Sequence, residues 1–338
     1  MDGLADCRII EQAVKEFSKA RLRKRAQSNL LRKPNAGQRK PGAIATGLGF
    51  NSPMHRLSSS EKNPSFELNS NTSLNLIKEE IAIMKKLNHH NLVSLMEVLD
   101  DPQEDSLYMV LEMCKKGVAM RVGLDERADP YDDERCRHWF RDMILGIEYL
   151  HAQGIIHRDI KPDNCLITDD DVLKIVDFGV SEMFEKQSEM ATAKSAGSPA
   201  FMPPELCVPK HGQVSGRAAD IWSMGVTLFC LRYGRIPFEK GSIIELYDSV
   251  RNDDLTMDNE RNESFADLMR KLLDKDPETR ITMEEIRVRV VSCRGCKLDR
   301  ILTEHHRTIL GSRRTVQIPF YPPKRTARIS LSRLRRSR

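Results

Sequence analysis

The sequence lacks the long hydrophobic run that would place it in a membrane. Its longest nearly unbroken apolar stretch, residues 221–231, is much shorter than the roughly 20 residues that a transmembrane helix requires. The first ten residues contain no basic segment followed by an apolar run, so they do not predict a secretory signal. Internal repeats are also absent. With 40% hydrophobic and 30% charged residues, the composition excludes a wholly disordered chain and a collagen-like fibre, and it predicts a soluble globular protein.

The eight cysteines are too scattered to indicate a small scaffold held by disulfides. Several lie in apolar segments, where a thiol acts as a small hydrophobic side chain, and this is typical of a reducing compartment. We therefore expect a cytoplasmic protein, with the nucleus as a further location. Cys293 and Cys296 have the spacing of zinc or redox ligands, and only His305 and His306 follow them as further candidates. Ordinary thiols without a metal are the favoured interpretation.

Basic residues are concentrated in two parts of the chain. The formal net charge is +5, but residues 301–338 hold ten Lys or Arg and one acidic residue, so the rest of the chain is mildly acidic. Residues 19–40 hold nine Lys or Arg and no acid, and residues 41–73 are rich in Ser, Asn, Pro and Gly without periodicity. We expect a flexible insertion over 19–73 and a disordered tail over 301–338. Neither contains a base-reading motif, so no specific nucleic acid is predicted as a partner.

Hydrophobic periodicity predicts both strands and helices. Residues 8–18 alternate in character as a strand does, and from Leu74 apolar residues recur every three or four positions, as on one face of a helix. The pattern after Gly117 is mostly helical until it fades near residue 300. The other expected elements are strands at 92–99, 106–113, 164–168 and 172–176 and helices at 134–152 and 219–233.

Two short motifs in the middle of the chain carry the chemistry. The first reads HRDIKPDN and contains Asp159, and the second reads DFG and begins at Asp177, 18 positions later. Phosphoryl transfer needs alignment of the reactants and cancellation of negative charge rather than covalent help from the protein. A carboxylate at Asp159 can accept the proton of an incoming hydroxyl, and Lys161 can neutralise charge on the moving phosphoryl group. The oxygens of Asn164 and Asp177 suit Mg²⁺ bound to phosphates.

With these motifs in this order and spacing, the chain resembles the eukaryotic protein kinases. Either motif alone could be an ordinary turn, but the later strings MPPE, DIWSMG and KDPETR agree with the family pattern. The resemblance implies an α+β, two-lobed fold with a truncated β-rich small lobe and a mainly α-helical large lobe. It also implies ATP and Mg²⁺ in the cleft. Lys161 between the catalytic Asp and the Asn indicates the serine/threonine branch rather than the tyrosine branch.

The resemblance also assigns residues of the small lobe to ATP. The string QAVKEFSK places Lys15 where kinases hold the phosphates of ATP, and EEIAIMKKLNHHN places Glu80 where its partner on a helix belongs. Leu111 then lies at the back of the adenine pocket, and the backbone from Glu112 to Cys114 forms the hinge that binds adenine. A Lys in a strand and a Glu on a helix are more often solvated, so the first two assignments depend on the motifs downstream.

The same resemblance makes three assignments in the large lobe. It implies a buried ion pair between Glu205 and Arg280 that anchors the substrate-binding loop, and losing one partner of such a pair should be costly. Ser198, in GSPAFMPPE, stands where these kinases keep a Thr that contacts the catalytic Asp and Lys; the alternative is a simple turn residue. Arg158 could bind a phosphate on the segment between Asp177 and Glu205. We do not expect such a switch, because the resembling family is generally active without it.

One part of the kinase pattern has no counterpart in this sequence. Kinases place a GxGxxG loop and a strand upstream of the lysine, where backbone N–H groups cover the phosphates. Only 14 residues precede Lys15, and Gly3 is the only glycine among them. Two interpretations remain open: a protein serine/threonine kinase, or a catalytically impaired kinase-fold protein that acts as a binding module or scaffold. The intact HRDIKPDN and DFG motifs favour the enzyme.

A long basic insertion between the lysine strand and the following helix narrows the resemblance to the calcium/calmodulin-dependent protein kinase kinases, especially those of fungi. The strings KEFSKARLRKRAQ, LMEVLDDPQEDSLYMVLEM, VDFGVSEMF and GSPAFMPPEL support it, and it covers about residues 10–290. It implies a kinase that phosphorylates the activation loops of other kinases in calcium or energy signalling, and an insertion that helps to engage the substrate kinase. For residues 21–25 the alternative is a solvated charge run or a nuclear-import patch.

Calmodulin is a further candidate partner. It binds basic amphipathic helices with large apolar anchors. Residues 324–338 are basic but offer only Ile329, Leu331 and Leu334, and prolines interrupt the approach, so no calmodulin site is evident. The expected organisation is a residual small-lobe segment at 1–18, the insertion at 19–73, the rest of the small lobe and hinge at 74–114, the large lobe at 115–300 and the basic tail at 301–338.

Overall fold

The computed structural model describes the segments that form the sheet, the helices and most of the connecting loops. All of them belong to the first of two units into which the chain divides, residues 1–292. Most of the predicted insertion, the basic tail with its calmodulin candidate, and the Cys293–Cys296 pair lie outside the described residues. The described residues are 11–21, 72–124, 126–184, 190–192, 197–208, 211–258 and 260–291.

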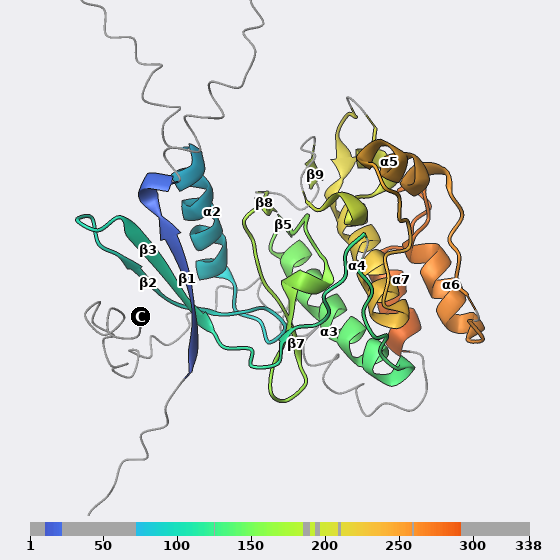
Figure 1. The fold of residues 1–338 in the computed structure, drawn as a ribbon, viewed down its shortest axis with the longest axis horizontal. Helices are drawn as coiled ribbons and strands as arrows, with labels where there is room; N and C mark the ends of the chain where they lie inside the picture. Colours follow the sequence, from blue (N-terminus) through green and yellow to red (C-terminus); the bar gives the residue numbers. More distant parts are fainter. Residues whose placement is uncertain are drawn as a thin grey trace, which may run out of the picture. The chain divides into compact units, whose positions relative to one another are not determined.

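The described elements are short strands and longer helices, and after β10 only helices follow among the described residues (Figure 1). The helices are α2 (Thr72–Lys86), α3 (Asp133–Ala152), α4 (Gly216–Tyr233), α5 (Ile243–Asn252), α6 (Glu263–Leu272) and α7 (Met283–Val291), with short 3₁₀ helices η1 (Pro162–Asn164), η3 (Pro199–Phe201) and η4 (Pro204–Leu206). The strands are β1 (Gln12–Ser18), β2 (Leu95–Asp100), β3 (Ser106–Glu112), β4 (Gly117–Val118), β5 (Ile155–Ile156), β6 (Cys165–Ile167), β7 (Leu173–Ile175), β8 (Glu182–Met183), β9 (Ala191–Thr192) and β10 (Val214–Ser215).

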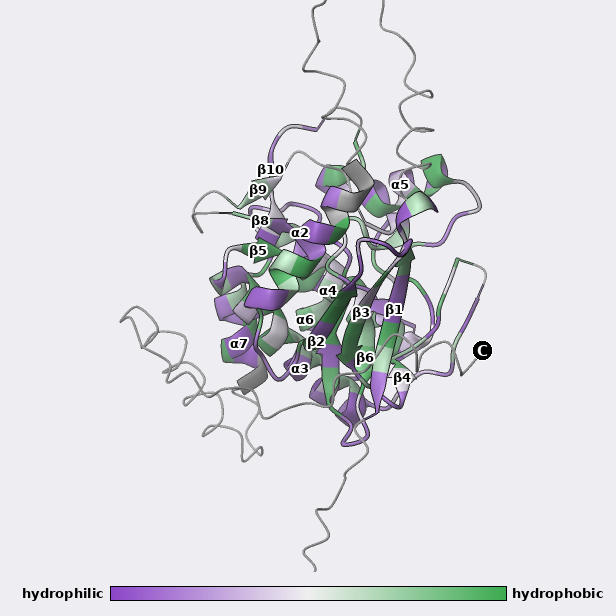
Figure 2. Ribbon diagram, turned by 90° about the vertical axis from the view of Figure 1, so that its left-hand side faces the viewer, coloured by the Kyte–Doolittle hydropathy of each residue, from purple (hydrophilic) through white to green (hydrophobic). Residues whose placement is uncertain are grey.

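A three-stranded antiparallel sheet in the order β1-β3-β2 forms the β-rich part of the molecule. The central strand β3 is hydrophobic along much of its length (Figure 2), and Met109 in its middle is fully buried. Helix α2 contributes Ile77, Ile81 and Met84 to the same hydrophobic cluster as Met109, because their spacing places them on one face of the helix. Sheet and helix therefore share one core, and Lys15 lies opposite Met109 in the strand register.

Helix α4 is the buried centre of the helical part. Its residues from Ala219 to Leu231 are all buried, as expected for a helix that other elements surround. The helix begins after Ser215, whose side chain accepts a hydrogen bond from the Ala218 N–H group, and it ends at Gly234 with a φ of 65°. A Ser cap and a left-handed glycine are the common signals of these two helix ends.

The hairpin formed by β6 and β7 brings the two sequence motifs together. Cys165 lies opposite Ile175 in this antiparallel pair, and the Val176 N–H group donates to Asn164 O just beyond it (3.0 Å). The motif before β6 and the motif after β7 are therefore neighbours. A parallel bridge between Leu92 and Ile175 connects the same hairpin to the chain that follows α2.

The predicted α+β fold, with a β-rich part and a mainly helical part, is confirmed. The mostly helical pattern expected after Gly117 is wrong for the residues before α3, where the described residues contain no helix. Pro130 lacks an N–H group, and the N–H groups of Ala128 and Tyr131 donate to carbonyls at the end of α4 instead. No helix among the described residues is long and apolar enough to cross a membrane.

Candidate active site

Three charged residues that are far apart in the sequence meet where β1, α2 and the DFG segment come together. Lys15 Nζ lies 2.9 Å from Glu80 Oε1 and 3.3 Å from Asp177 Oδ1. Burial lowers the pKa of Lys15, but the attraction of Glu80 and Asp177 outweighs this effect and raises that pKa above its ordinary value. Glu80 is buried, whereas the other two side chains remain partly exposed. The arrangement is an ammonium group that is held charged and stays partly exposed.

Asp159 is the centre of a second polar cluster. Its Oδ2 lies 3.0 Å from Lys161 Nζ, and its Oδ1 accepts hydrogen bonds of 2.9 Å from both the backbone N–H and the hydroxyl of Ser198. Burial raises the pKa of Asp159, but the hydrogen bonds from Lys161 and Ser198 outweigh it and hold that pKa below its ordinary value. Asp159 is therefore a carboxylate at neutral pH. Ser198 contacts both Asp159 and Lys161, so it is more than a simple turn residue.

Asn164 and Asp177 present oxygen atoms of different charge. The Asn164 side-chain N–H₂ group donates to Asp159 O and Oδ2 at 2.8 and 2.9 Å, and this fixes the orientation of the amide. The amide oxygen is then the atom left for a hard cation. Asp177 has a φ of 69°, a left-handed conformation that is uncommon for a residue other than glycine and that aims its carboxylate toward Lys15.

Sequence reasoning missed a buried aspartate that supports the turn at His157 and Arg158, which belongs to the catalytic loop, residues 157–164. Asp220 is fully buried in α4, and its two oxygens accept hydrogen bonds from the N–H groups of His157 and Arg158 at 3.0 and 2.8 Å. His151 Nε2 lies 2.8 Å from Asp220 Oδ2. Arg158 has a φ of 70°, so this strained turn is stabilised by the carboxylate beneath it. An acidic residue inside the otherwise buried string DIWSMG was the available signal.

The aromatic residue of the DFG motif anchors the segment in the core. Phe178 is buried, and its ring packs edge-on against that of His157 with 5.4 Å between the ring centres. His157 Nε2 in turn lies 3.2 Å from Val176 O. The two motifs thus support each other through side chains as well as through the hairpin, with Asp159 and Asp177 following His157 and Val176 in the chain.

Arg158 has a carboxylate partner, which sequence reasoning also missed. Its Nη1 lies 3.4 Å from Glu182 Oε2, and its Nε donates to Val180 O. Burial lowers the pKa of Arg158, and the Glu182 charge opposes this shift. The same Glu182 oxygen accepts a hydrogen bond of 2.8 Å from the Thr192 hydroxyl. A carboxylate of the segment between Asp177 and Glu205, called the activation segment below, therefore lies beside the Arg158 guanidinium, where the resemblance suggests that a phosphate could bind.

The predicted hinge lies at the end of β3, and some of its polar groups already form contacts within the protein. Leu111 and Cys114 are buried, and burial raises the pKa of the Cys114 thiol to about 11. The Glu112 N–H group donates to Ser94 O, and its carboxylate lies 2.9 Å from Lys174 Nζ. The Glu112 side chain thus serves the protein's own packing.

The predicted ion pair between Glu205 and Arg280 is confirmed. Arg280 donates from Nη1 to Glu205 Oε1 at 2.8 Å and from Nη2 to Glu205 Oε2 at 2.9 Å. Nη1 also donates to Ala218 O, and Nε donates to Asp274 O. The guanidinium lies over the Trp222 ring, 5.1 Å from its centre. This bidentate pair joins η4 to the start of α4 and to the chain before α7.

Comparison with known proteins agrees with this geometry. A family model described as the protein kinase domain matches residues 61–290. The calcium/calmodulin-dependent protein kinase kinase cmkC of Emericella nidulans is 59% identical over 284 residues, which make up 82% of this chain and 52% of that protein. The calcium/calmodulin-dependent protein kinase kinase of Caenorhabditis elegans is 43% identical over 218 residues, 64% of this chain and 40% of that protein.

The serine/threonine-protein kinase ssp1 of Schizosaccharomyces pombe is 40% identical over 238 residues, 68% of this chain and 36% of that protein. The chain spans about half the length, or less, of these three relatives.

Proposed function

Because the chain belongs to the protein kinase family, we propose that it transfers the γ-phosphoryl group of ATP to serine or threonine residues of another protein kinase. The single observation that carries this proposal is the cluster of Asp159, Lys161 and Ser198, in which an ionised carboxylate and an ammonium lie 3.0 Å apart. This pairing serves an acceptor hydroxyl and a transferring phosphoryl group. A scaffold without catalysis would have no use for it, so that alternative is not favoured.

On the acceptor side, Asp159 orients the substrate hydroxyl and accepts its proton. The hydrogen bonds that keep its pKa low also fix the position of the carboxylate, so the hydroxyl is held in line for attack. Lys161 stabilises negative charge that develops on the phosphoryl oxygens. Its hydrogen bond of 2.7 Å to the Ser198 hydroxyl positions the ammonium without neutralising it.

On the nucleotide side, the residues present fit ATP with Mg²⁺. Lys15, held by Glu80, binds phosphate oxygens, and the backbone from Glu112 to Cys114 binds adenine beside Leu111. The oxygens of Asn164 and Asp177 are the hard donors that Mg²⁺ prefers, and a site that shares the ion with phosphates needs only one or two protein carboxylates. The bound ion would neutralise charge on the phosphates.

The substrate class follows from the relatives rather than from the geometry. Two of the similar proteins are calcium/calmodulin-dependent protein kinase kinases by name, and this supports a substrate that is itself a kinase, in calcium or energy signalling. The same names support calmodulin as a regulatory partner. Calmodulin binding is a separate proposal from catalysis, because the residues that form the Asp159 cluster do not depend on it.

The test of the proposed function is the variant Asp159→Asn. The protein is incubated with Mg²⁺, labelled ATP and Ser- or Thr-containing activation-loop peptides, and incorporation of phosphate is measured. We expect kcat to fall by about 10² to 10⁴, the range of a general base, while the thermal unfolding midpoint stays close to that of the wild type. Asp170→Asn, an exposed carboxylate in the turn between β6 and β7, is the matched control and should leave kcat unchanged.

Two results would contradict the proposal. Wild-type protein that phosphorylates no peptide would overturn the activity itself. Normal turnover by Asp159→Asn would overturn the role of this carboxylate and leave the activity to another group.

A further inference from the structure

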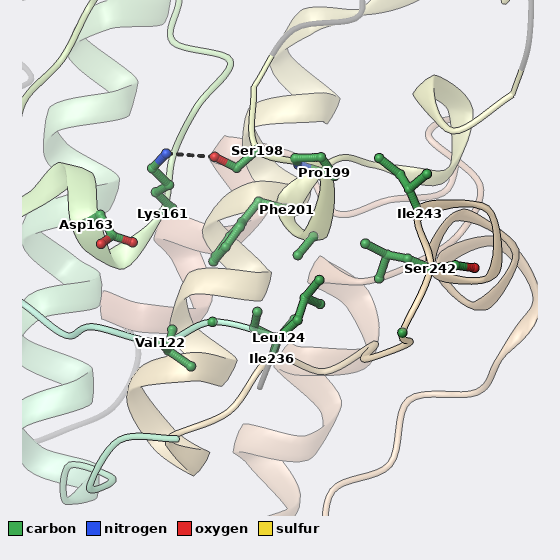
Figure 3. Close-up of a pocket in the computed structure, with 14 residues that line it drawn as sticks. Val122, Leu124, Lys161, Asp163, Ser198, Pro199, Phe201, Ile236, Ser242 and Ile243 are labelled. Carbon is green, nitrogen blue, oxygen red and sulfur yellow. Dashed lines mark hydrogen bonds between the residues drawn. The ribbon is translucent and has the colours of Figure 1, made fainter. Parts of the chain in front are cut away.

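A pocket of about 320 Å³ adjoins the catalytic loop. Lys161 and Ser198, which are hydrogen-bonded to each other, form one side of it, and Ser242 and Ile243 at the start of α5 form the other (Figure 3). Phe201 lies between these two sides in the same view. The pocket is therefore continuous with the place where Asp159 and Lys161 meet the acceptor hydroxyl.

The lining of this pocket is mostly apolar. Among the described residues that line it, Asp163 and Lys161 are the charged ones, and they carry opposite signs. Lys161 lies 3.0 Å from Asp159, so the Lys161 ammonium would repel a positively charged side chain of a ligand that approaches the Asp159 carboxylate. The apolar side chains that line the pocket are Val122, Leu124, Phe201, Ile236, Ile243 and Leu246.

Two of these apolar side chains are exposed to solvent. Leu124 is 41% exposed and Ile243 is 53% exposed, although they come from segments more than a hundred residues apart. A single exposed apolar residue is common on a protein surface, but several that line one concave site are typical of a surface that a ligand covers. Burying them against an apolar group would be favourable.

We propose that this pocket binds an apolar side chain of the protein substrate, of the size of Leu, Ile or Met, close to the phosphorylated residue. The inference rests on the proposed function. A strand advances by about 3.3 Å per residue, and the pocket shares Lys161 with the catalytic cluster, so the bound side chain belongs to a position within about three residues of the phosphorylated Ser or Thr. The pocket thus selects substrates by an apolar neighbour and disfavours a basic one.

A set of peptides with one Ser or Thr acceptor tests this assignment. Leu, Ala, Arg or Asp is placed in turn at each of the three positions before and the three positions after the acceptor, and kcat/KM is measured with Mg²⁺ and ATP. We expect Leu at one position to exceed Ala and Arg by about tenfold or more, which is the discrimination that an apolar pocket provides.

The variant Ile243→Glu turns the test into a change of preference. A carboxylate at that edge of the pocket should remove the advantage of Leu and raise kcat/KM for the peptide with Arg at the same position. A misfolded protein could not produce this gain. Ile244→Glu is the matched control, because Ile244 is the next residue in α5, is 79% exposed and does not line the pocket. It should keep the wild-type preference.

Several outcomes would overturn the assignment. Peptides that are phosphorylated with no preference for Leu at any of the six positions would do so, and so would a Leu preference that Ile243→Glu leaves intact. If Ile243→Glu raised kcat/KM equally for every peptide, the pocket would be occupied by a segment of this chain rather than by the substrate. If wild-type protein phosphorylated no peptide, the proposed function would fall, and this assignment with it.

Discussion

Ser198 shows how much one small residue can contribute at the site. Its N–H group and its hydroxyl both reach Asp159 Oδ1, and the hydroxyl also accepts a hydrogen bond from Lys161. It therefore joins the activation segment to the two residues that serve the acceptor hydroxyl. Hydrogen bonds to the ionised form of a carboxylate lower its pKa, so Ser198 helps to keep Asp159 able to accept a proton.

The pH dependence of activity tests this role of Ser198. Ser198→Ala removes the hydroxyl that stabilises the Asp159 carboxylate, so the pKa of Asp159 rises and the acid limb of kcat/KM moves to higher pH. Asp159 stays ionised at neutral pH, but it loses a hydrogen bond that holds it in position and is worth about 1.5 kcal/mol or more, so kcat/KM at neutral pH should still fall about tenfold. Ser198→Thr keeps the hydroxyl and should keep both the acid limb and most of the activity. An acid limb that does not move in Ser198→Ala would contradict the assignment.

At the scale of elements, the activation segment is held by very short strands. β8 pairs with β5 and β9 pairs with β10, and each strand contains two residues. Such short pairs have little stability of their own. Glu182 in β8 joins them, because its carboxylate lies beside Arg158 of the catalytic loop and accepts a hydrogen bond from Thr192 of β9. We infer that the charge of Glu182 holds β8 and β9 beside Arg158 without a phosphate.

The variant Glu182→Gln separates the charge from the shape. The amide oxygen can still accept the hydrogen bond from Thr192, but the buried Arg158 guanidinium loses the stronger of two opposite charges, with Asp220 remaining. We expect kcat to fall about tenfold, an effect of about 1.4 kcal/mol, with faster hydrogen exchange in β8 and β9. Thr192→Val, which keeps the ion pair, should have a smaller effect on kcat. Wild-type kcat and exchange in Glu182→Gln would show that the charge is not needed.

The elements and part of the site were predictable from the sequence. The residues of the HRDIKPDN and DFG strings could be assigned because each string places its side chains within a few positions. Lys15 and Glu80 required the family resemblance, because 65 positions separate them and no periodicity predicts their contact. Asp220 and Ile243 were missed for the same reason: their function comes from segments that the fold brings together. The start of α4 was placed three residues late because the capping role of Ser215 was not recognised.

At the scale of the whole molecule, the site depends on contacts between remote segments. Lys15 and Asp177 are 162 positions apart, and their contact joins the β-rich part to the DFG segment. The backbone pairs that Ile175 makes with Asn91 and Val93 join the chain after α2 to the same hairpin. Lys15 and Glu80, which are proposed to serve the nucleotide, come from β1 and α2, and Asp159 and Lys161, which are proposed to serve the acceptor, come from the segment before β6. The proposed catalysis therefore requires both parts to be folded and in contact.

The ion pair between Glu205 and Arg280 is a buried, bidentate contact in the helical part. The Arg280 side chain is fully buried and donates to Glu205, to Ala218 O and to Asp274 O. Glu205→Ala leaves the guanidinium buried without its carboxylate, so the free energy of unfolding should fall by about 3–5 kcal/mol. Urea denaturation measures this as a lower midpoint with an unchanged slope.

Two further variants distinguish the cost of leaving the Arg280 charge unpaired from the cost of losing an ion pair. The double variant Glu205→Leu with Arg280→Met leaves no unpaired charge in the core, so it should be less destabilised than Glu205→Ala, because apolar residues of similar volume often replace a buried ion pair at little cost. Arg127→Ala removes an exposed ion pair with Glu239 and should lower the free energy of unfolding by less than about 1 kcal/mol. If Glu205→Ala lowered the free energy of unfolding no more than Arg127→Ala does, burial would not strengthen the contribution of the Glu205–Arg280 pair to stability. The segment that contains Glu205 would then need another anchor.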